Sequence, residues 1–99
     1  MFTTLFKKSS TKIKNMIDEG ALIIDVRTPL EFKNGHMQGS KNIPLDTLSS
    51  KIDDLKKLNK KLITVCRSGS RSATAKEMLA SAGIDVCNGG AWQNLKEAI

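Results

Sequence analysis

Short runs of apolar residues alternate with segments of helical periodicity along this chain, and this alternation constrains the fold more than any other feature. Ala21–Val26 and Leu62–Cys66 are almost continuously apolar, which is typical of strands buried on both faces of a sheet. Ile84–Cys87 predicts a third, shorter strand, and Asn42–Pro44 predicts an edge strand that ends at a proline. The pattern predicts an α/β fold in three layers, with a small parallel sheet covered by helices on both faces.

Helices are predicted between these strands from the apolar spacing and from residues that start or stop helices. The spacing of Ile13, Met16 and Ile17 indicates a short helix, with Ser10 or Thr11 as its cap and Gly20 as its end. The other predicted helices are a turn from Pro29 through Phe32, an amphipathic helix over Asp46–Leu58, a helix capped by Ser70 or Ser72 and ended by Gly83, and a closing helix over Ala91–Ala98.

Cys66 stands between a predicted strand and a predicted helix, where a protein can keep a thiolate. A helix start leaves backbone N–H groups unpaired, and a loop of small residues lets those donors converge on one point. The loop carries two arginines and a glycine within seven residues, namely Cys66, Arg67, Ser68, Gly69, Ser70, Arg71 and Ser72. Such surroundings lower the pKa of a cysteine, so we expect Cys66 to be mostly thiolate at neutral pH. An inert core cysteine is the alternative that this combination of residues disfavours.

Polar residues also close the first predicted strand. Asp25 and Arg27 end it, Glu31 follows one short turn later, and His36 lies in the next loop. Because ligands bind beyond the carboxyl ends of parallel strands, these four side chains are supporting candidates for the site around Cys66. Taken singly, each has a structural role as its simpler interpretation: Asp25 can pair with Arg27, and a lone histidine more often fixes a loop than performs chemistry.

Composition bounds the class of protein. The 99 residues predict one domain over 1–99, and no apolar run is long enough to span a membrane. The net charge of +6 comes mainly from lysines that are spread along the chain and are not interleaved with a set of aromatic stacking residues, which favours a solvated surface over nucleic-acid binding. Two cysteines are too few for a zinc site or a disulfide framework. The start of the chain lacks the apolar core of a secretory signal, which predicts a cytoplasmic protein.

The ordered motifs of the chain resemble the single-domain rhodanese-like sulfurtransferases. The resemblance runs from about Leu22 to Leu95. Its parts are Ile24-Asp25-Val26-Arg27, Glu31-Phe32, Gly35-His36-Met37-Gln38-Gly39 leading to Asn42-Ile43-Pro44, the loop of residues 66–72, and Gly89-Gly90 with Trp92. It implies a rhodanese fold and a catalytic Cys66 that accepts a sulfane sulfur to become a persulfide. It also implies that the backbone N–H groups of Arg67 to Ser72 form the cradle for that sulfur.

The reaction that this resemblance implies is sulfur transfer. We expect the Cys66 thiolate to attack a small anionic donor such as thiosulfate, while Arg67 and Arg71 donate charge-assisted hydrogen bonds to the departing sulfite. Cyanide, a small thiol or a cysteine of another protein then removes the sulfur. The reaction requires no cofactor and no metal, and we expect neither a nucleic-acid nor a membrane partner. A monomer or a weak homodimer is the expected state of assembly.

Two alternative functions follow from the same residues, and the role of Cys87 is a separate open question. Cys-based phosphatases and arsenate reductases resemble Cys-x5-Arg, whereas Cys66 and Arg71 enclose four residues, a shorter loop that suits a sulfur atom better than a phosphoryl group. A non-catalytic rhodanese-like binding module is a second alternative, and such modules often lack the cysteine. Cys87 is either a resolving thiol for Cys66 or, more simply, part of the core.

Overall fold

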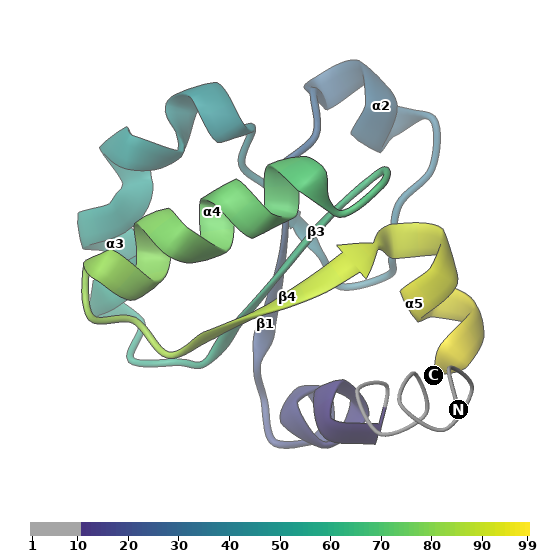
Figure 1. Cartoon of the computed structure of the whole chain (residues 1–99), viewed down its shortest axis with the longest axis horizontal. Coiled ribbons are helices and arrows are strands. Elements are labelled where there is room, and N and C mark those ends of the chain that lie inside the picture. Colours follow the sequence, from purple (N-terminus) through teal and green to yellow (C-terminus); the bar gives the residue numbers. More distant parts are fainter. Residues whose placement is uncertain (1–10) are drawn as a thin grey trace.

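A computed structural model describes residues 11–99 of the chain (Figure 1). Four strands form one sheet in the order β2-β1-β3-β4, and every neighbouring pair is parallel. The strands are β1 (Leu22–Asp25), β2 (Lys41–Asn42), β3 (Leu62–Cys66) and β4 (Val86–Ala91). The predicted α/β architecture with a small parallel sheet is therefore confirmed. Because the strands are parallel, their carboxyl ends meet at one edge of the sheet.

The helices lie between the strands, as the alternation predicts. They are the helix of residues 11–18, α2 (Pro29–Lys33), the 3₁₀ helix η1 (Leu45–Lys51), α3 (Ile52–Lys57), α4 (Ser70–Ser81) and α5 (Trp92–Ala98). Helix 11–18 ends near Gly20, whose positive φ of 99° and N–H bond to the Ile17 carbonyl close it. Of its two predicted caps, Ser10 lies outside the described residues. No helix within residues 11–99 is both long enough and apolar enough to cross a membrane.

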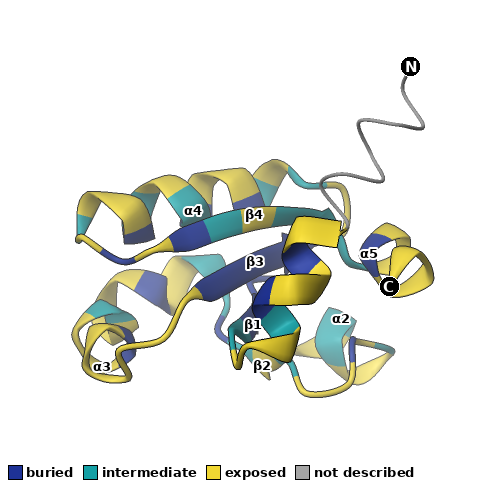
Figure 2. Cartoon of the chain, turned by 90° about the horizontal axis from the view of Figure 1, so that it is seen from below, coloured by how far each residue is buried: buried dark blue, intermediate teal, exposed yellow. Residues whose placement is uncertain are grey.

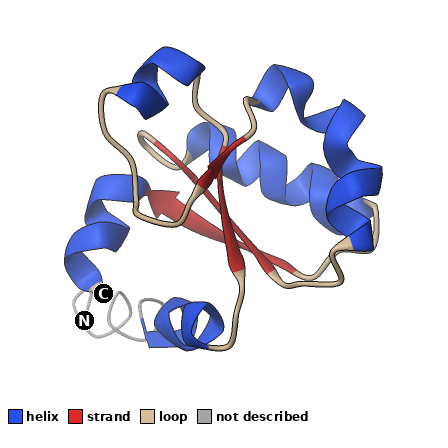
Figure 3. Cartoon of the chain, turned by 180° about the vertical axis from the view of Figure 1, so that it is seen from behind, coloured by secondary structure: helices blue, strands red, loops and turns tan. Residues whose placement is uncertain are grey.

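Two cores lie on opposite faces of the sheet. On one face, Leu48 of η1, Leu55 of α3 and Leu79 of α4 pack with strand residues such as Ile24 and Leu62. The other core is smaller and contains Ile13 and Met16 of helix 11–18, Ile23 and Ile63 of the sheet, and Leu95 of α5. Figure 3 shows the strands between these two groups of helices, and Figure 2 shows β3 buried along its length. The three predicted layers are present.

The predicted helix over Asp46–Leu58 is wrong as a single α-helix. The segment begins as the 3₁₀ helix η1 and continues as the short helix α3. Thr47 Oγ1 donates to the Pro44 carbonyl at 3.0 Å, and Ser50 Oγ donates to the Thr47 carbonyl at 2.7 Å. These local bonds reach back three residues, a spacing that suits three residues per turn.

Strand β4 lies later in the chain than predicted. It covers Val86–Ala91 instead of Ile84–Cys87, so the closing helix begins at Trp92 instead of Ala91. The pairing of β3 with β4 shifts register between Thr64 and Val65, which skips Gly89 and makes a bulge. Glycines made this segment a poor strand candidate, but the bulge requires them. The predicted edge strand over Asn42–Pro44 likewise shortens and shifts to Lys41–Asn42.

We predict that Gly89→Ala destabilises the fold. A Cβ atom at Gly89 would lie 2.9 Å from side-chain carbons of both Ile63 and Val65 and 3.1 Å from Leu95. Overpacking of this kind costs about 1–3 kcal/mol, to be measured as the free energy of unfolding in urea. Gln93→Ala, at an exposed position of α5, is the control and should change that free energy by less than about 0.5 kcal/mol. Equal stabilities of the two variants would contradict the bulge packing.

Candidate active site

The loop between β3 and α4 places Cys66 at the carboxyl edge of the sheet. Cys66 is the last residue of β3, and α4 begins at Ser70. Gly69 precedes α4 with a φ of 99°, and a Cβ atom there would lie 3.5 Å from the Gly90 Cα of the β4 bulge. The predicted cap by Ser70 or Ser72 is wrong, because neither side chain caps the helix start. A glycine in the left-handed region turns the chain instead, and this turn points the loop N–H groups at Cys66.

The sulfur of Cys66 accepts hydrogen bonds from this loop. The N–H of Gly69 lies 3.0 Å from Sγ and the N–H of Ser72 lies 3.4 Å from it. Burial raises the pKa of the Cys66 thiol, but hydrogen bonds from the Ser72 hydroxyl and from the N–H groups of Ser72, Gly69 and Ser68 lower it by more. The net pKa lies below the ordinary value, in the direction that favours the thiolate.

Two residues that the sequence did not single out hold this loop in place. Thr64, a polar residue in the fully buried strand β3, donates from Oγ1 to the Ser72 carbonyl at 2.9 Å. Asn88 of β4 donates from Nδ2 to the Gly69 carbonyl at 3.4 Å, and its Oδ1 accepts from the Gly90 N–H at 2.9 Å. The available signals were a threonine inside an apolar strand and an asparagine directly before two glycines. Thr64 and Asn88 are therefore positioning residues.

The two arginines of the loop have different surroundings. Arg71 makes a two-pronged ion pair with Glu31 of α2, with Nη1 and Nη2 at 2.8 and 3.0 Å from the carboxylate oxygens. Glu31 also completes a capping box with Thr28 at the start of α2. Arg67 is exposed and makes no ion pair within residues 11–99. The structure thus joins the predicted Glu31 to Arg71 and leaves the Arg67 guanidinium free.

Asp25 and Arg27 form a buried ion pair behind the site. The Arg27 Nε and Nη2 atoms lie 2.9 and 2.7 Å from the two carboxylate oxygens of Asp25, and Nη2 also donates to the Gly35 carbonyl at 2.7 Å. The guanidinium stacks 4.7 Å from the ring centroid of Trp92. Asp25 is fully buried and Arg27 nearly so. The pair fixes the loop after α2 against the start of α5, which is a supporting role and matches the structural interpretation of these residues.

His36 does not reach the cysteine loop through any bond within the described residues. Its ring stacks on Phe32 with centroids 3.7 Å apart, and its Nδ1 lies 2.7 Å from the Phe32 carbonyl. A carbonyl oxygen only accepts, so Nδ1 carries the proton. These contacts fix the loop after α2, the role that a solitary histidine between glycines most often has.

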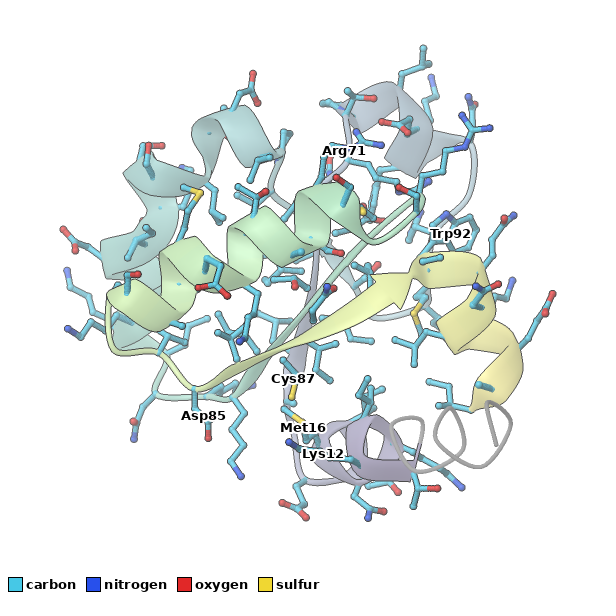
Figure 4. All side chains as sticks on the ribbon, in the orientation of Figure 1. Lys12, Met16, Arg71, Asp85, Cys87 and Trp92 are labelled. Atoms are coloured by element: carbon cyan, nitrogen blue, oxygen red, sulfur yellow. The ribbon has the colours of Figure 1, made fainter. Side chains whose placement is uncertain are left out.

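Cys87 packs away from Cys66. In the β3–β4 register Cys87 pairs with Ile63, three residues before Cys66 and about 10 Å from it along the strand. Cys66 belongs to the core under α4, whereas Cys87 packs against the core under helix 11–18. Figure 4 shows Cys87 beside Met16 and away from Arg71 at the start of α4. The two thiols lie on opposite faces of the sheet, so this fold rules out a disulfide between them and leaves Cys87 its packing role.

Groups that could bind a metal ion do not gather in the part of the chain that the structure describes. Within residues 11–99 no three side chains of His, Cys, Asp or Glu come together. The chemistry that the described site offers is that of a hydrogen-bonded cysteine sulfur with cationic neighbours.

The comparisons with known proteins identify the family. The family model of the rhodanese-like domain matches residues 9–96, and the chain belongs to this family. A crystal structure of a rhodanese-like domain protein from Staphylococcus aureus superposes with a TM-score of 0.69 at 33% sequence identity, covering 88% of this chain and 86% of that one. The resemblance predicted from the motifs is thus confirmed.

Curated relatives share about a third of their aligned residues with this chain. The uncharacterized protein YqhL of Bacillus subtilis is 36% identical over 63 residues, which are 64% of this chain and 49% of that protein. The thiosulfate sulfurtransferase PspE of Escherichia coli is 36% identical over 61 residues, which are 61% of this chain and 59% of that protein. The chain spans about half the length of the curated relatives it matches. These similarities establish that the chain belongs to a family that includes sulfurtransferases.

We predict that the Glu31–Arg71 ion pair stabilises the fold in a pH-dependent way. Hydrogen bonds from Arg71 and Thr28 lower the pKa of Glu31 from 4.5 to about 2. Because the folded pKa is the lower one, the stabilisation is present above about pH 4.5 and is lost as the pH falls toward 2. Glu31→Gln should therefore cost about 1 kcal/mol of unfolding free energy at pH 7 and progressively less as the pH falls through about 2.

Urea unfolding between pH 2 and pH 7 measures this difference. Glu77→Gln is the control, because Glu77 is exposed and its pairing with Lys76 is long, at 3.7 Å. That control should track the wild type at every pH. A loss of stability in Glu31→Gln that persists undiminished near pH 2 would show that the charge of Glu31 is not its cause.

Proposed function

We propose that this protein is a sulfurtransferase that moves a sulfane sulfur from thiosulfate or a related donor to a thiophilic acceptor through a persulfide on Cys66. The observation that carries the proposal is the Cys66 sulfur at a helix start, held by the N–H groups of Gly69 and Ser72. Membership of the rhodanese-like family supports it, as do relatives named thiosulfate sulfurtransferase. The proposal also covers catalytic Cys66 and a substrate-binding loop of residues 67–72.

In the first half-reaction the Cys66 thiolate attacks the outer sulfur of thiosulfate. A bond forms between the two sulfurs, and the bond from that outer sulfur to the sulfite group breaks, with its electron pair leaving on sulfite. The product on the enzyme is a persulfide whose outer sulfur carries the negative charge. Backbone N–H groups at the start of α4 stabilise an anion at this position. The step consumes no proton and needs neither a metal nor a cofactor.

Arg67 is the residue that we assign to the donor anion. Arg67 directly follows Cys66 in the chain, is exposed and has no ion-pair partner in residues 11–99, whereas Arg71 is paired with Glu31. Arg67 therefore offers direct hydrogen bonds to the sulfite part of the donor. Arg71 adds positive charge from its fixed position.

In the second half-reaction an acceptor removes the outer sulfur. Cyanide, a small thiol or a protein cysteine attacks that sulfur, the bond between the two sulfurs breaks, and its electron pair returns to Cys66 as a thiolate. The enzyme is then ready for another donor. Each half-reaction transfers one sulfur atom, with one bond formed and one broken. Neither step therefore needs an external oxidant or reductant.

Intact mass spectrometry tests the persulfide. After incubation with thiosulfate and removal of excess donor, we expect the wild type to gain the mass of one sulfur atom. Cys66→Ala should gain nothing, because it has no nucleophile at the start of α4. Cys87→Ala is the matched control and should gain one sulfur as the wild type does.

Two results would contradict the sulfurtransferase proposal. An unchanged wild-type mass under these conditions would favour a binding module. Hydrolysis of an aryl phosphate without thiocyanate formation from thiosulfate and cyanide would favour the phosphatase reading of the loop.

Steady-state kinetics with thiosulfate and cyanide test Arg67. We expect Arg67→Ala to lower kcat/KM for thiosulfate by about tenfold or more, because a hydrogen bond between charged groups is lost. Lys14→Ala removes an equal charge from an exposed position of helix 11–18 and serves as the control, with kcat/KM close to that of the wild type. A similar loss in both variants would mean that overall charge attracts the donor, whereas an unchanged Arg67→Ala would exclude Arg67 from donor binding.

A further inference from the structure

The side chain of Ser72 makes contacts that the backbone cradle does not explain. Ser72 and Cys66 are both fully buried, and Ser72 Oγ lies 3.4 Å from Cys66 Sγ. The same hydroxyl lies 3.1 Å from the carbonyl oxygen of Gly69. A hydroxyl donates one hydrogen bond and can also accept one. Ser72 Oγ therefore lies between the Gly69 carbonyl, which only accepts, and the Cys66 sulfur, which donates as a thiol and accepts as a thiolate.

We propose that Ser72 is a catalytic residue whose hydroxyl group rotates as the charge on the Cys66 sulfur changes. The O–H then donates either to the Gly69 carbonyl or to the Cys66 sulfur. When Cys66 is a thiol, its S–H donates to Ser72 Oγ, and the Ser72 O–H donates to the Gly69 carbonyl. When Cys66 is a thiolate, it has no proton to give, and the Ser72 O–H rotates to donate to Sγ. No proton leaves Ser72 in either arrangement.

The Gly69 carbonyl keeps other donors when the Ser72 hydroxyl turns away. Gly69 O also accepts from the Ala73 N–H at 3.1 Å and from Asn88 Nδ2 at 3.4 Å. An acceptor left without a donor would hold the hydroxyl on the carbonyl, whereas this carbonyl stays paired in both arrangements. Thr64, through its bond to the Ser72 carbonyl, keeps the backbone of Ser72 fixed while the hydroxyl rotates.

The switch deepens the proposed function and rests on it for its catalytic consequence. In the persulfide the charge lies on the outer sulfur, so Sγ no longer needs the hydroxyl. When an acceptor takes the outer sulfur, the electron pair returns to Sγ, and the Ser72 O–H stabilises this leaving thiolate. Loss of the hydroxyl should therefore slow the discharge of the persulfide as well as raise the pKa of Cys66.

The pH dependence of alkylation tests the switch independently of sulfur transfer. Iodoacetamide reacts with the thiolate, and peptide mapping separates reaction at Cys66 from reaction at Cys87. In Ser72→Ala we expect the midpoint of the plot of Cys66 alkylation rate against pH to rise by about 1 pH unit. This shift corresponds to a tenfold smaller fraction of thiolate at pH values below the midpoint. Other charged groups near the sulfur are identical in wild type and variant, so the difference reports on the hydroxyl; these groups are Asp25, Arg27, Glu31, Arg67 and Arg71.

Two further variants make the test specific. Ser81→Ala removes an exposed hydroxyl from the other end of α4 and should leave the midpoint unchanged. Ser72→Thr keeps the hydroxyl and should have a midpoint close to the wild-type value. Circular dichroism checks that each variant is folded, which we expect because alanine is smaller than serine and favours helix.

The outcomes separate this proposal from the proposed function. An unmoved midpoint in folded Ser72→Ala would overturn the switch, and so would a rise of equal size in folded Ser72→Thr or in Ser81→Ala. Single-turnover discharge of the loaded persulfide by cyanide then tests the catalytic consequence, with a slower rate expected for Ser72→Ala. If the wild type never gains sulfur, the sulfurtransferase proposal fails while the alkylation midpoints still decide whether the hydroxyl stabilises the thiolate.

Discussion

The pairing of β1 with β3 is the interaction on which the rest of the structure depends. These two strands are the centre of the sheet, they run in parallel, and Asp25 of β1 lies opposite Val65 of β3. Their register brings the ion pair of Asp25 with Arg27 and the thiol of Cys66 to the same edge. Had the strands been antiparallel, these groups would stand at opposite ends of the sheet, and no single loop could gather them. The direction of the strands thus decides that these groups meet at one edge, and the side chains then decide what the site can do.

Each support of the cysteine loop comes from a different element. Thr64 of β3 donates to the Ser72 carbonyl, Asn88 of β4 donates to the Gly69 carbonyl, and Glu31 of α2 pairs with Arg71. A thiolate needs donors whose positions do not relax when charge develops, and a loop tied to several rigid elements meets that need. The buried ion pair of Asp25 and Arg27 serves the same purpose at a distance, because it fixes the chain that leads to and from α2.

The sequence predicts the sheet and the cysteine loop because both depend on local patterns. Continuous apolar runs mark β1 and β3, and Cys66 with its arginines and Gly69 forms one short motif. What sequence reasoning misses depends on contacts between distant segments. The partner of Arg71 is forty residues away on α2, the support from Thr64 requires knowing that α4 crosses over β3, and β4 is concealed by glycines that only its bulge explains. The 3₁₀ helix η1 escapes notice because its apolar spacing is also that of an α-helix.

The bulge in β4 has a consequence for how the molecule behaves in a crowded solution. In the part of the chain that the structure describes, β4 is one of the two outer strands of the sheet, and an outer strand offers unpaired backbone groups to any other extended chain. The register shift at Gly89 interrupts the regular row of those groups, and the chain turns into α5 directly after Ala91. A foreign strand could therefore pair with only a short stretch of β4 before losing register. The same irregularity that seats the cysteine loop against Gly90 also protects this edge from unwanted association.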